Sequence, residues 1–121
     1  MRIVNPTALL KGEDLATEHL RKKGYKIIER NFRKGYGEID IIAIKDNVLV
    51  FVEVKTRTSN AFGTPFEAIT YFKLETLIKT AQFYKALNPR LPEALRIDEI
   101  SVLLDNSSNF INIEHIENIS G

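Results

Sequence analysis

Apolar residues recur at helical spacing over residues 7–23, and Gly24 supplies a stop. A second helical pattern, built on apolar residues from Ile69 and Phe72 onward, runs to Leu87 and ends at Asn88-Pro89. Alternating or β-branched segments that predict strands occupy 25–32, 38–44, 48–54, 95–104 and 110–116. The pattern therefore predicts a single α/β domain over residues 1–121, in the order α-β-β-β-α-β-β, with a loose tail from Glu117.

The second and third predicted strands are joined by Asp46-Asn47, residues that tolerate the positive φ angles of a tight hairpin. A loop of two or four residues gives pairs whose numbers sum to 93, which sets Asp40 opposite Glu53 and Glu38 opposite Lys55. Side chains alternate along a strand, so all four lie on one face. The hairpin is expected to form the core of the domain.

Two carboxylates facing each other among Ile and Val side chains repel, and desolvation strengthens the repulsion. A divalent cation offsets it, because Mg²⁺ or Mn²⁺ takes one or two protein carboxylates together with water and phosphate oxygens. Lys55 follows Glu53 by two residues, within reach of a group bound to the metal. This arrangement suits phosphodiester hydrolysis, in which a metal activates water and an ammonium offsets developing charge. The alternative is a set of structural ion pairs on the hairpin surface.

Glu13 falls at the edge of the apolar stripe of the first helix, near Leu9 and Leu20. We expect it to point toward the border of the sheet, where it joins a metal shell or holds a ligated water. The other interpretation is an ordinary ion pair between Glu13 and a neighbouring Lys or Arg. His19 and His115 are expected to be packed or peripheral rather than a paired metal site.

Composition removes several classes of function. The chain has no cysteine, which excludes disulfides, zinc-thiolate sites and thiol nucleophiles. It has no apolar run typical of a signal peptide or a membrane span, so we expect a cytoplasmic protein without a membrane partner. The net charge of +1 does not indicate a nucleic-acid binder, and any such case depends on local placement.

Asp40 followed by Glu53-Val54-Lys55 resembles the D…ExK signature of the PD-(D/E)xK phosphodiesterase superfamily, which includes restriction enzymes and Holliday-junction resolvases. Over nearly the whole chain the sequence resembles the YraN family of uncharacterised, endonuclease-like bacterial proteins. The segments that carry this likeness are Gly12-Glu13, Lys23-Gly24-Tyr25, Arg30-Asn31-Phe32-Arg33, Gly37–Ala43 and Phe51–Arg57.

The resemblance implies a restriction-endonuclease-like fold, in which helices flank a central mixed sheet. It also implies that Asp40, Glu53 and the backbone carbonyl of Val54 are metal ligands and that Lys55 is the catalytic lysine. Glu13 becomes the helix-borne acid of the resolvase-like branch, catalytic and a further candidate ligand. Glu38 sits in the Gly-Glu-Ile-Asp motif, where we assign it only a tuning role, and Asp98 receives no role.

Cations flank the acidic centre from both sides in the sequence. We take five residues as candidates for nucleic-acid contact, with a solvated basic rim as the alternative: Arg30, Arg33, Lys34, Thr56 and Arg57. Contacts of this kind hold phosphates without reading sequence. The loop Phe62-Gly63-Thr64-Pro65 is either a substrate loop or a plain connection.

These observations predict a Mg²⁺- or Mn²⁺-dependent endonuclease acting on DNA, structure-selective or non-specific, on branched, repair or recombination intermediates. One alternative is a catalytically idle nucleic-acid-binding partner module of DNA repair, recombination or uptake. Another is an RNA nuclease. The sequence leaves a homodimer open, which a four-way junction cutter would need.

Overall fold

The structure is a computed structural model that describes residues 6–58 and 70–121. The predicted loop at Phe62–Pro65 and the expected helical residue Ile69 lie outside the described residues. The helices and strands, in chain order, are α1 (Pro6–Lys22), β1 (Lys26–Lys34), β2 (Gly37–Lys45), β3 (Val48–Thr58), α2 (Tyr71–Leu87), β4 (Ala94–Leu104) and β5 (Phe110–Ile116). This order confirms the predicted succession α-β-β-β-α-β-β.

The strands form a five-stranded sheet in the order β1-β2-β3-β4-β5. Neighbouring strands are antiparallel except for β3 and β4, which run parallel and are connected through α2. A parallel connection needs such a crossover, because its two strands must start at the same edge of the sheet. The sheet is therefore mixed, as the resemblance implies.

The hairpin between β2 and β3 has the predicted register. Asp46 and Asn47 both adopt positive φ angles, 49° and 62°, as a two-residue turn requires. The ladder then runs from Lys45 opposite Val48 to Ile41 opposite Val52, and each pair sums to 93. The strand residues of this hairpin supply much of the buried core, which confirms its expected position.

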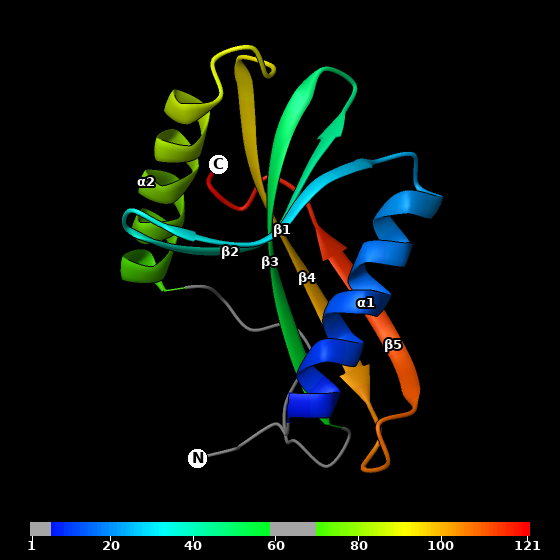
Figure 1. The fold of residues 1–121 in the computed structure, drawn as a ribbon. Helices are drawn as coiled ribbons and strands as arrows, with labels where there is room; N and C mark the ends of the chain where they lie inside the picture. The colour runs from blue at the N-terminus through cyan, green and yellow to red at the C-terminus, as the bar shows by residue number, and fades with distance from the viewer. Residues whose placement is uncertain (1–5, 59–69) are drawn as a thin grey trace.

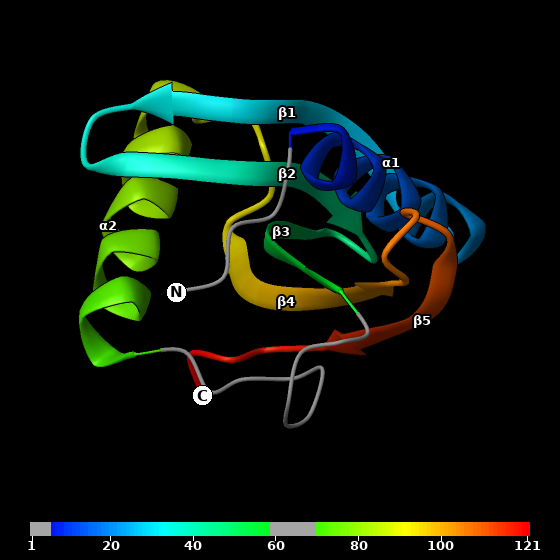
Figure 2. The ribbon, with the colours of Figure 1, turned by 90° about the horizontal axis from the view of Figure 1, so that it is seen from below.

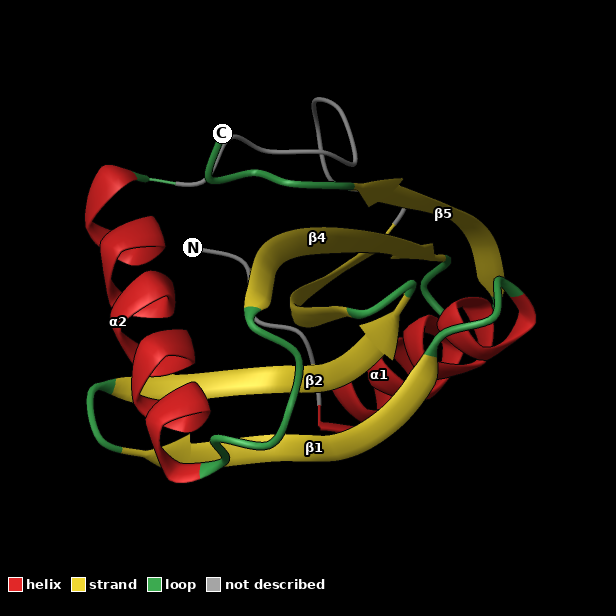
Figure 3. Ribbon diagram, turned by 90° about the horizontal axis from the view of Figure 1, so that it is seen from above, coloured by secondary structure: helices red, strands yellow, loops and turns green. Residues whose placement is uncertain are grey.

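The two helices cover opposite faces of the sheet, as Figures 1 and 3 show, and each covers its own apolar cluster. Ala8, Ala16 and Leu20 bring α1 onto the alternate residues Val50 and Val52 of β3. On the other face, α2 packs on a cluster that contains Leu49, Phe51, Leu77, Ala81 and Tyr84. Along β3, the side that carries Leu49 and Phe51 continues to Glu53 and Lys55.

The sheet divides beyond Ile41. Strands β1 and β2 run on together toward α2 (Figure 2), and their turn meets this helix, where a Cβ on Gly35 would lie 2.8 Å from the Phe83 ring. Strand β3 instead continues beside β4 as far as Thr58, opposite Leu104. This parallel pairing is why β3 extends four residues beyond the predicted end at Val54.

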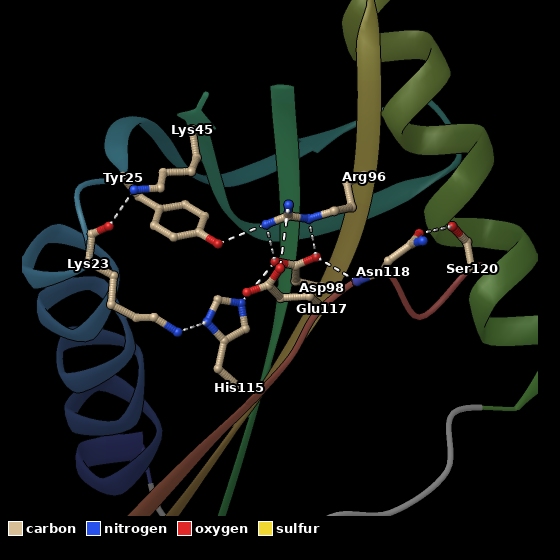
Figure 4. Close-up of polar contacts among 9 residues, drawn as sticks. All are labelled: Lys23, Tyr25, Lys45, Arg96, Asp98, His115, Glu117, Asn118 and Ser120. Atoms are coloured by element: carbon tan, nitrogen blue, oxygen red, sulfur yellow. Dashed lines mark hydrogen bonds and ion pairs between the residues drawn. The ribbon is translucent and has the colours of Figure 1, made fainter. Parts of the chain in front are cut away.

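A cluster of polar side chains lies on the α1 face of β4 (Figure 4). The Asp98 side chain, which is 0% exposed, accepts hydrogen bonds from Arg96 Nε at 2.9 Å and from the backbone N–H of Asn118 at 2.9 Å. His115 Nε2 lies 2.8 Å from Asp98 Oδ2, and Arg96 Nη2 donates to the Tyr25 hydroxyl at 2.7 Å. Asp98, which the resemblance left without a role, therefore joins β4, β5 and the residues after β5, and Arg96 extends the cluster to Tyr25 after α1.

The tail after β5 is attached to the sheet, so the prediction that it is loose from Glu117 is wrong. The Asn118 N–H is one of the donors to Asp98, and the Ile119 N–H donates to the carbonyl of Ile97 at 2.8 Å. A buried carboxylate twenty residues earlier supplies the anchor, a partner that local polarity does not reveal.

Phe72 is also placed differently from the sequence pattern. It stands at helical spacing with the apolar residues of α2, yet it is 81% exposed. The buried residues of this helix begin only at Leu77 and are Leu77, Thr80, Ala81 and Tyr84. Neither helix in the described part of the chain has the length and apolar character needed to cross a bilayer.

Candidate functional site

Asp40 and Glu53 meet where β2 separates from β3. They lie one residue beyond the last ladder pair, Ile41 and Val52, in the register that sets them opposite each other. The Asp40 carboxyl is hydrogen-bonded to Glu53, and its Oδ2 accepts a hydrogen bond from the Val54 backbone N–H at 2.7 Å. The Glu53 side chain is 12% exposed. The two acids therefore form one partly buried pair on the α2 face.

The environment of this pair favours protonated Asp40. Burial raises the pKa of Asp40 most, and the hydrogen bond with Glu53 and the charges of Glu53 and Glu13 raise it further. The Val54 N–H acts in the opposite direction, and the outcome is a pKa of about 8. In the protein without a metal, the pair therefore keeps a proton near neutral pH, because burial and a second acid both disfavour the charged form of Asp40.

Lys73, in the first turn of α2, is a residue of this site that sequence reasoning missed. Its Nζ lies 3.0 Å from Glu53 Oε2. Burial lowers the pKa of Lys73, but the hydrogen bond to Glu53 and the negative charges of Glu53 and Asp40 outweigh burial and raise it. The Thr70 side chain caps the helix by accepting from the Lys73 N–H at 3.1 Å. The only local signal was a lysine at the start of a helix after the strand that carries Glu53.

The parallel strand β4 brings a third acid that sequence reasoning also missed. Glu99, 1% exposed, is the register partner of Glu53, and Ser101 is the partner of Lys55. Partners in a parallel ladder point to the same face, so Glu99 and Glu53 are side-by-side neighbours. Lys55 is half-buried on this face, two residues after Glu53.

Glu13 forms the ion pair of the structural interpretation and lies close enough to Asp40 for its charge to act there. Its carboxylate lies 3.7 Å from Arg30 Nη2, the ion pair of the structural interpretation, and its charge also contributes to the raised pKa of Asp40. Its position follows from Gly12, because a Cβ at Gly12 would collide with the side chain of Thr56. A glycine here lets α1 approach β3 closely and carries Glu13 toward the acidic pair.

The predicted pairing of Glu38 with Lys55 is wrong. The ladder between β2 and β3 ends at Ile41, and Glu38 instead faces Arg33 across β1 and β2. The carboxylate of Glu38 and Arg33 Nε are 3.0 Å apart on the surface. Glu38 does reach the site through its charge, which contributes to the raised pKa of Lys73. The divergence of β2 from β3 separates the expected partners.

The candidate nucleic-acid contacts lie in three places. Arg30 is held by α1, with Nη1 3.0 Å from Asp14 in addition to its pairing with Glu13. Arg33 and Lys34 line a hollow of about 430 Å³ at the turn between β1 and β2. Thr56 packs against Gly12 on the α1 face, and Arg57 is half-buried near the end of β3. Of the five, Arg33 and Lys34 are the exposed cations.

We call the place where β2 separates from β3, next to Asp40 and Glu53, the fork. The side chains at the fork limit how many ligands the protein can give a metal ion. Within residues 6–58 and 70–121, no group of three or more His, Asp or Glu side chains is arranged to hold a metal ion. The carboxylates of Asp40 and Glu53, which repel each other, are nevertheless the hard oxygen donors that Mg²⁺ and Mn²⁺ prefer, and these ions commonly keep several waters. The residues present therefore fit a hydrated divalent cation held by two carboxylates.

The profile of the uncharacterised protein family UPF0102 matches residues 12–102, a span that contains Glu13, Asp40, Glu53 and Lys55. The chain belongs to UPF0102. This is the YraN family that the sequence resembles.

Relatives within UPF0102 match over most of their length. The UPF0102 protein of Syntrophomonas wolfei is 49% identical over 107 residues, covering 88% of this chain and 91% of that protein. The UPF0102 protein of Alkaliphilus oremlandii is 49% identical over 110 residues, covering 88% and 92%. That of Geobacter metallireducens is 44% identical over 118 residues, covering 98% and 95%. The similarity therefore extends across both helices and the sheet.

Proposed function

We propose that this UPF0102 chain is a divalent-metal-dependent phosphodiesterase that acts on DNA as a structure-selective or non-specific endonuclease. The observation that carries the proposal is the pair of Asp40 and Glu53, which lie together where β2 separates from β3 although the charge of Glu53 makes it harder to ionise Asp40. A polypeptide has little structural reason to bury two acids of which one must stay protonated, whereas a divalent cation site requires two such carboxylates.

In this proposal Asp40 and Glu53 hold Mg²⁺ or Mn²⁺ together with the backbone carbonyl of Val54. A metal bound there polarises the phosphoryl group and lowers the pKa of a bound water. Lys55, on the face of β3 that carries Glu53, orients the attacking water or offsets charge on the phosphate. Glu13 lies close enough for its charge to act on Asp40, and it holds a ligated water at the rim of the site.

Exposed cations beside the acidic pair support a polyanionic substrate. Arg33 and Lys34 end β1, next to the turn that meets α2, and Lys73 Nζ lies 3.0 Å from Glu53 of the pair. Contacts from such side chains position a phosphate backbone without reading sequence. This supports structure-selective or non-specific cleavage over sequence-specific cleavage.

Lys73 favours one alternative, a catalytically idle nucleic-acid-binding module. Its ammonium lies 3.0 Å from Glu53 and can neutralise one carboxylate without any metal. In that case the fork would be a structural ion pair, and the module would act as a partner in DNA repair, recombination or uptake. The two functions differ in whether a divalent cation displaces the proton and the lysine from the acids.

Metal binding distinguishes these alternatives. Titration with Mn²⁺, followed by calorimetry and by the melting temperature, should give saturable binding and a rise in melting temperature, since a ligand of the native state stabilises it. Asp40→Asn should abolish both effects. Asp46→Asn is the matched control, because this turn residue is on the same hairpin and Asn tolerates its positive φ. Parent protein that is unaffected by Mn²⁺ and Mg²⁺ would rule out the metal site.

Cleavage is tested on linear, nicked, flapped and four-way DNA and on matching RNA. With Mn²⁺ or Mg²⁺ the parent should cut DNA, and Lys55→Gln should lower kcat while Mn²⁺ binding persists. Good metal binding with no cleavage of any substrate would favour the idle module. Cleavage confined to RNA would replace the DNA proposal with the RNA nuclease.

A further inference from the structure

Three large aromatic side chains stand in solvent at one end of α2. Tyr36, in the turn between β1 and β2, is 65% exposed, and Tyr71 and Phe72, in the first turn of α2, are 80% and 81% exposed. Aromatic side chains contribute most when buried, so a group of three exposed together marks a binding surface rather than ordinary surface composition. We call this group the aromatic platform.

The platform lines a defined hollow. Tyr36, Tyr71 and Phe72 border a space of about 340 Å³, whose other lining residues are Glu75, Thr76 and Lys79. Its two sides are held together, because the Tyr36 ring packs edge-on against Phe83 of α2 with centroids 6.3 Å apart. The hollow is therefore built jointly by the β1–β2 turn and by α2.

The charges around the platform favour an anionic ligand. Four cations lie near the platform: Lys79 lines its hollow, Arg33 and Lys34 line the neighbouring hollow that shares Tyr36, and Lys73 follows Phe72 in α2. The acids nearby are Glu38, which is paired with Arg33 at 3.0 Å, Glu53, which is paired with Lys73 at 3.0 Å, and Glu75, which lies beside the Tyr71 hydroxyl. Once these two ion pairs are set aside, Lys34 and Lys79 remain against Glu75, so the surface around the rings keeps a positive balance.

The platform adjoins the acidic pair. Phe72 immediately precedes Lys73, whose Nζ reaches Glu53 at 3.0 Å. On the other side of the hollow, a Cβ at Gly37 would lie 3.0 Å from Thr76, which shows how closely the start of β2 approaches α2. The Phe72 ring of the platform therefore lies one residue along α2 from the lysine that contacts Glu53.

The geometry points to a binding site for unpaired nucleotides of a DNA strand, whose bases stack on Tyr36, Tyr71 and Phe72 while Lys73, Lys79 and Lys34 hold the backbone. This inference rests on the proposed function and names its substrate class. Interleaved aromatic rings and cations are how single-stranded nucleic acid is bound, because every base has a face that stacks and every linkage carries a charge.

A fully paired duplex does not satisfy this surface. Its bases are stacked within the helix and cannot reach the rings without being unpaired. A flap, a gap, a frayed end or the open centre of a branch presents unpaired bases beside a phosphate that lies at the acids. The platform therefore selects DNA that has a single-stranded segment next to the cleaved bond.

Binding without metal tests the platform separately from catalysis. In EDTA, fluorescence anisotropy is measured with a labelled single strand of about a dozen nucleotides, a length within the site sizes of such proteins. The same strand in a blunt duplex and a matching RNA strand are the comparisons. The parent should bind the DNA single strand more tightly than the duplex. Each of Tyr36→Ala, Tyr71→Ala and Phe72→Ala should weaken single-strand binding by about 5- to 100-fold.

Two further variants test whether the loss of single-strand affinity is specific to the rings of the platform. Phe72→Trp should keep the affinity, because it retains a stacking ring. Phe110→Ala removes an aromatic residue of β5 that is 50% exposed and does not line the platform's hollow, so its affinity should be unchanged. All these side chains are exposed, and melting temperatures close to that of the parent would show that the variants fold.

The outcomes separate the platform from the proposed function. Equal binding of single strand and duplex, or unchanged affinity in the three alanine variants, would overturn the platform even if the parent cleaves DNA. Loss of single-strand affinity in the variants, together with a parent that never cleaves, would support the platform and reject the nuclease. Preference for RNA over DNA would overturn the assigned ligand. So would self-association of the parent that the alanine variants lose, since a second copy would then be the occupant.

Discussion

Asp40 on β2 and Asp98 on β4 are both withdrawn from water, on opposite faces of the same sheet, but their surroundings treat a negative charge in opposite ways. Burial alone would raise the pKa of Asp98, yet hydrogen bonds from His115, Arg96 and Asn118 outweigh it and lower the pKa. Asp40 has one backbone donor and an acidic neighbour, Glu53, and its pKa rises to about 8. One carboxylate is satisfied within the protein, and the other still requires a positive partner.

This difference separates a structural acid from a candidate functional one more clearly than burial does. Asp98 is the more deeply buried of the two, yet its partners account for its charge and it holds β4, β5 and the tail together. The pair of Asp40 and Glu53 is only partly compensated, by Lys73. A metal or a substrate therefore has something to contribute at the fork and little to contribute at Asp98.

The largest expected effect comes from Asp98. Asp98→Asn should destabilise the fold by about 3–5 kcal/mol, because Arg96 and His115 lose the buried carboxylate between them and Arg96 keeps only Glu117, at 3.6 Å. Urea unfolding measures the loss. Asp14→Asn is the control, since Asp14 is 59% exposed and its pairing with Arg30 should contribute less than about 1 kcal/mol. If the two variants unfold at the same urea concentration, Asp98 is not the structural acid described here.

A pH-dependent effect should follow from Asp40. Its folded-state pKa, about 8, lies above the ordinary value of 3.8, so the native state binds the extra proton between these values. Stability from this group is thus complete below about pH 4 and declines as pH rises toward 8. In EDTA at about pH 9, Asp40→Asn should exceed the parent in stability by at least about 1.4 kcal/mol, the equivalent of one pKa unit.

Urea unfolding at several pH values measures that difference. Near pH 4 the parent and Asp40→Asn should converge, because the protonated acid and the amide are both neutral. Asp98 should behave in the opposite way, losing its contribution as pH falls through its lowered pKa. A parent that is as stable as Asp40→Asn at high pH would mean that Asp40 is satisfied like Asp98.

The smallest change in stability is expected at Lys73. Its ion pair with Glu53 is partly exposed, with 47% of the lysine side chain accessible, so Lys73→Met should change stability by less than about 1 kcal/mol. It should nevertheless raise the pH at which Asp40 loses its proton, because a nearby positive charge is removed. Carbon NMR of the Asp40 carboxyl measures this midpoint, and Lys79→Met, on the same helix, is the control. An unchanged or lower midpoint would show that Lys73 does not compensate the pair.

Local sequence patterns were enough to predict the order of helices and strands and the pairing of Asp40 with Glu53. The positive φ of Asp46 and Asn47 and the alternation along β2 and β3 were enough to set the register that brings Asp40 to Glu53. Lys73 and Glu99 could not be found in this way. They reach Glu53 from α2 and from the parallel strand β4, and periodicity within one segment does not say which distant segment becomes its neighbour.

The wrong predictions share that cause. Glu38 was placed opposite Lys55 by extending a correct register beyond the point where the ladder ends. Phe72 was assigned to an apolar stripe because helical spacing does not say where a helix extends past the sheet it covers. The tail was judged loose because its anchor, Asp98, lies on another strand. Each error concerns long-range geometry rather than secondary structure.

The hydrogen bond from Val54 to Asp40 has a consequence for how the site can be taken apart. At the fork, a side chain replaces the main-chain carbonyl that a continuing ladder would have supplied to that amide. Asp40 thus completes the backbone hydrogen bonding of β3 as well as carrying the raised pKa of the acidic pair. Asparagine at position 40 would remove the titrating proton and keep an oxygen that accepts from the Val54 N–H, whereas alanine would remove both.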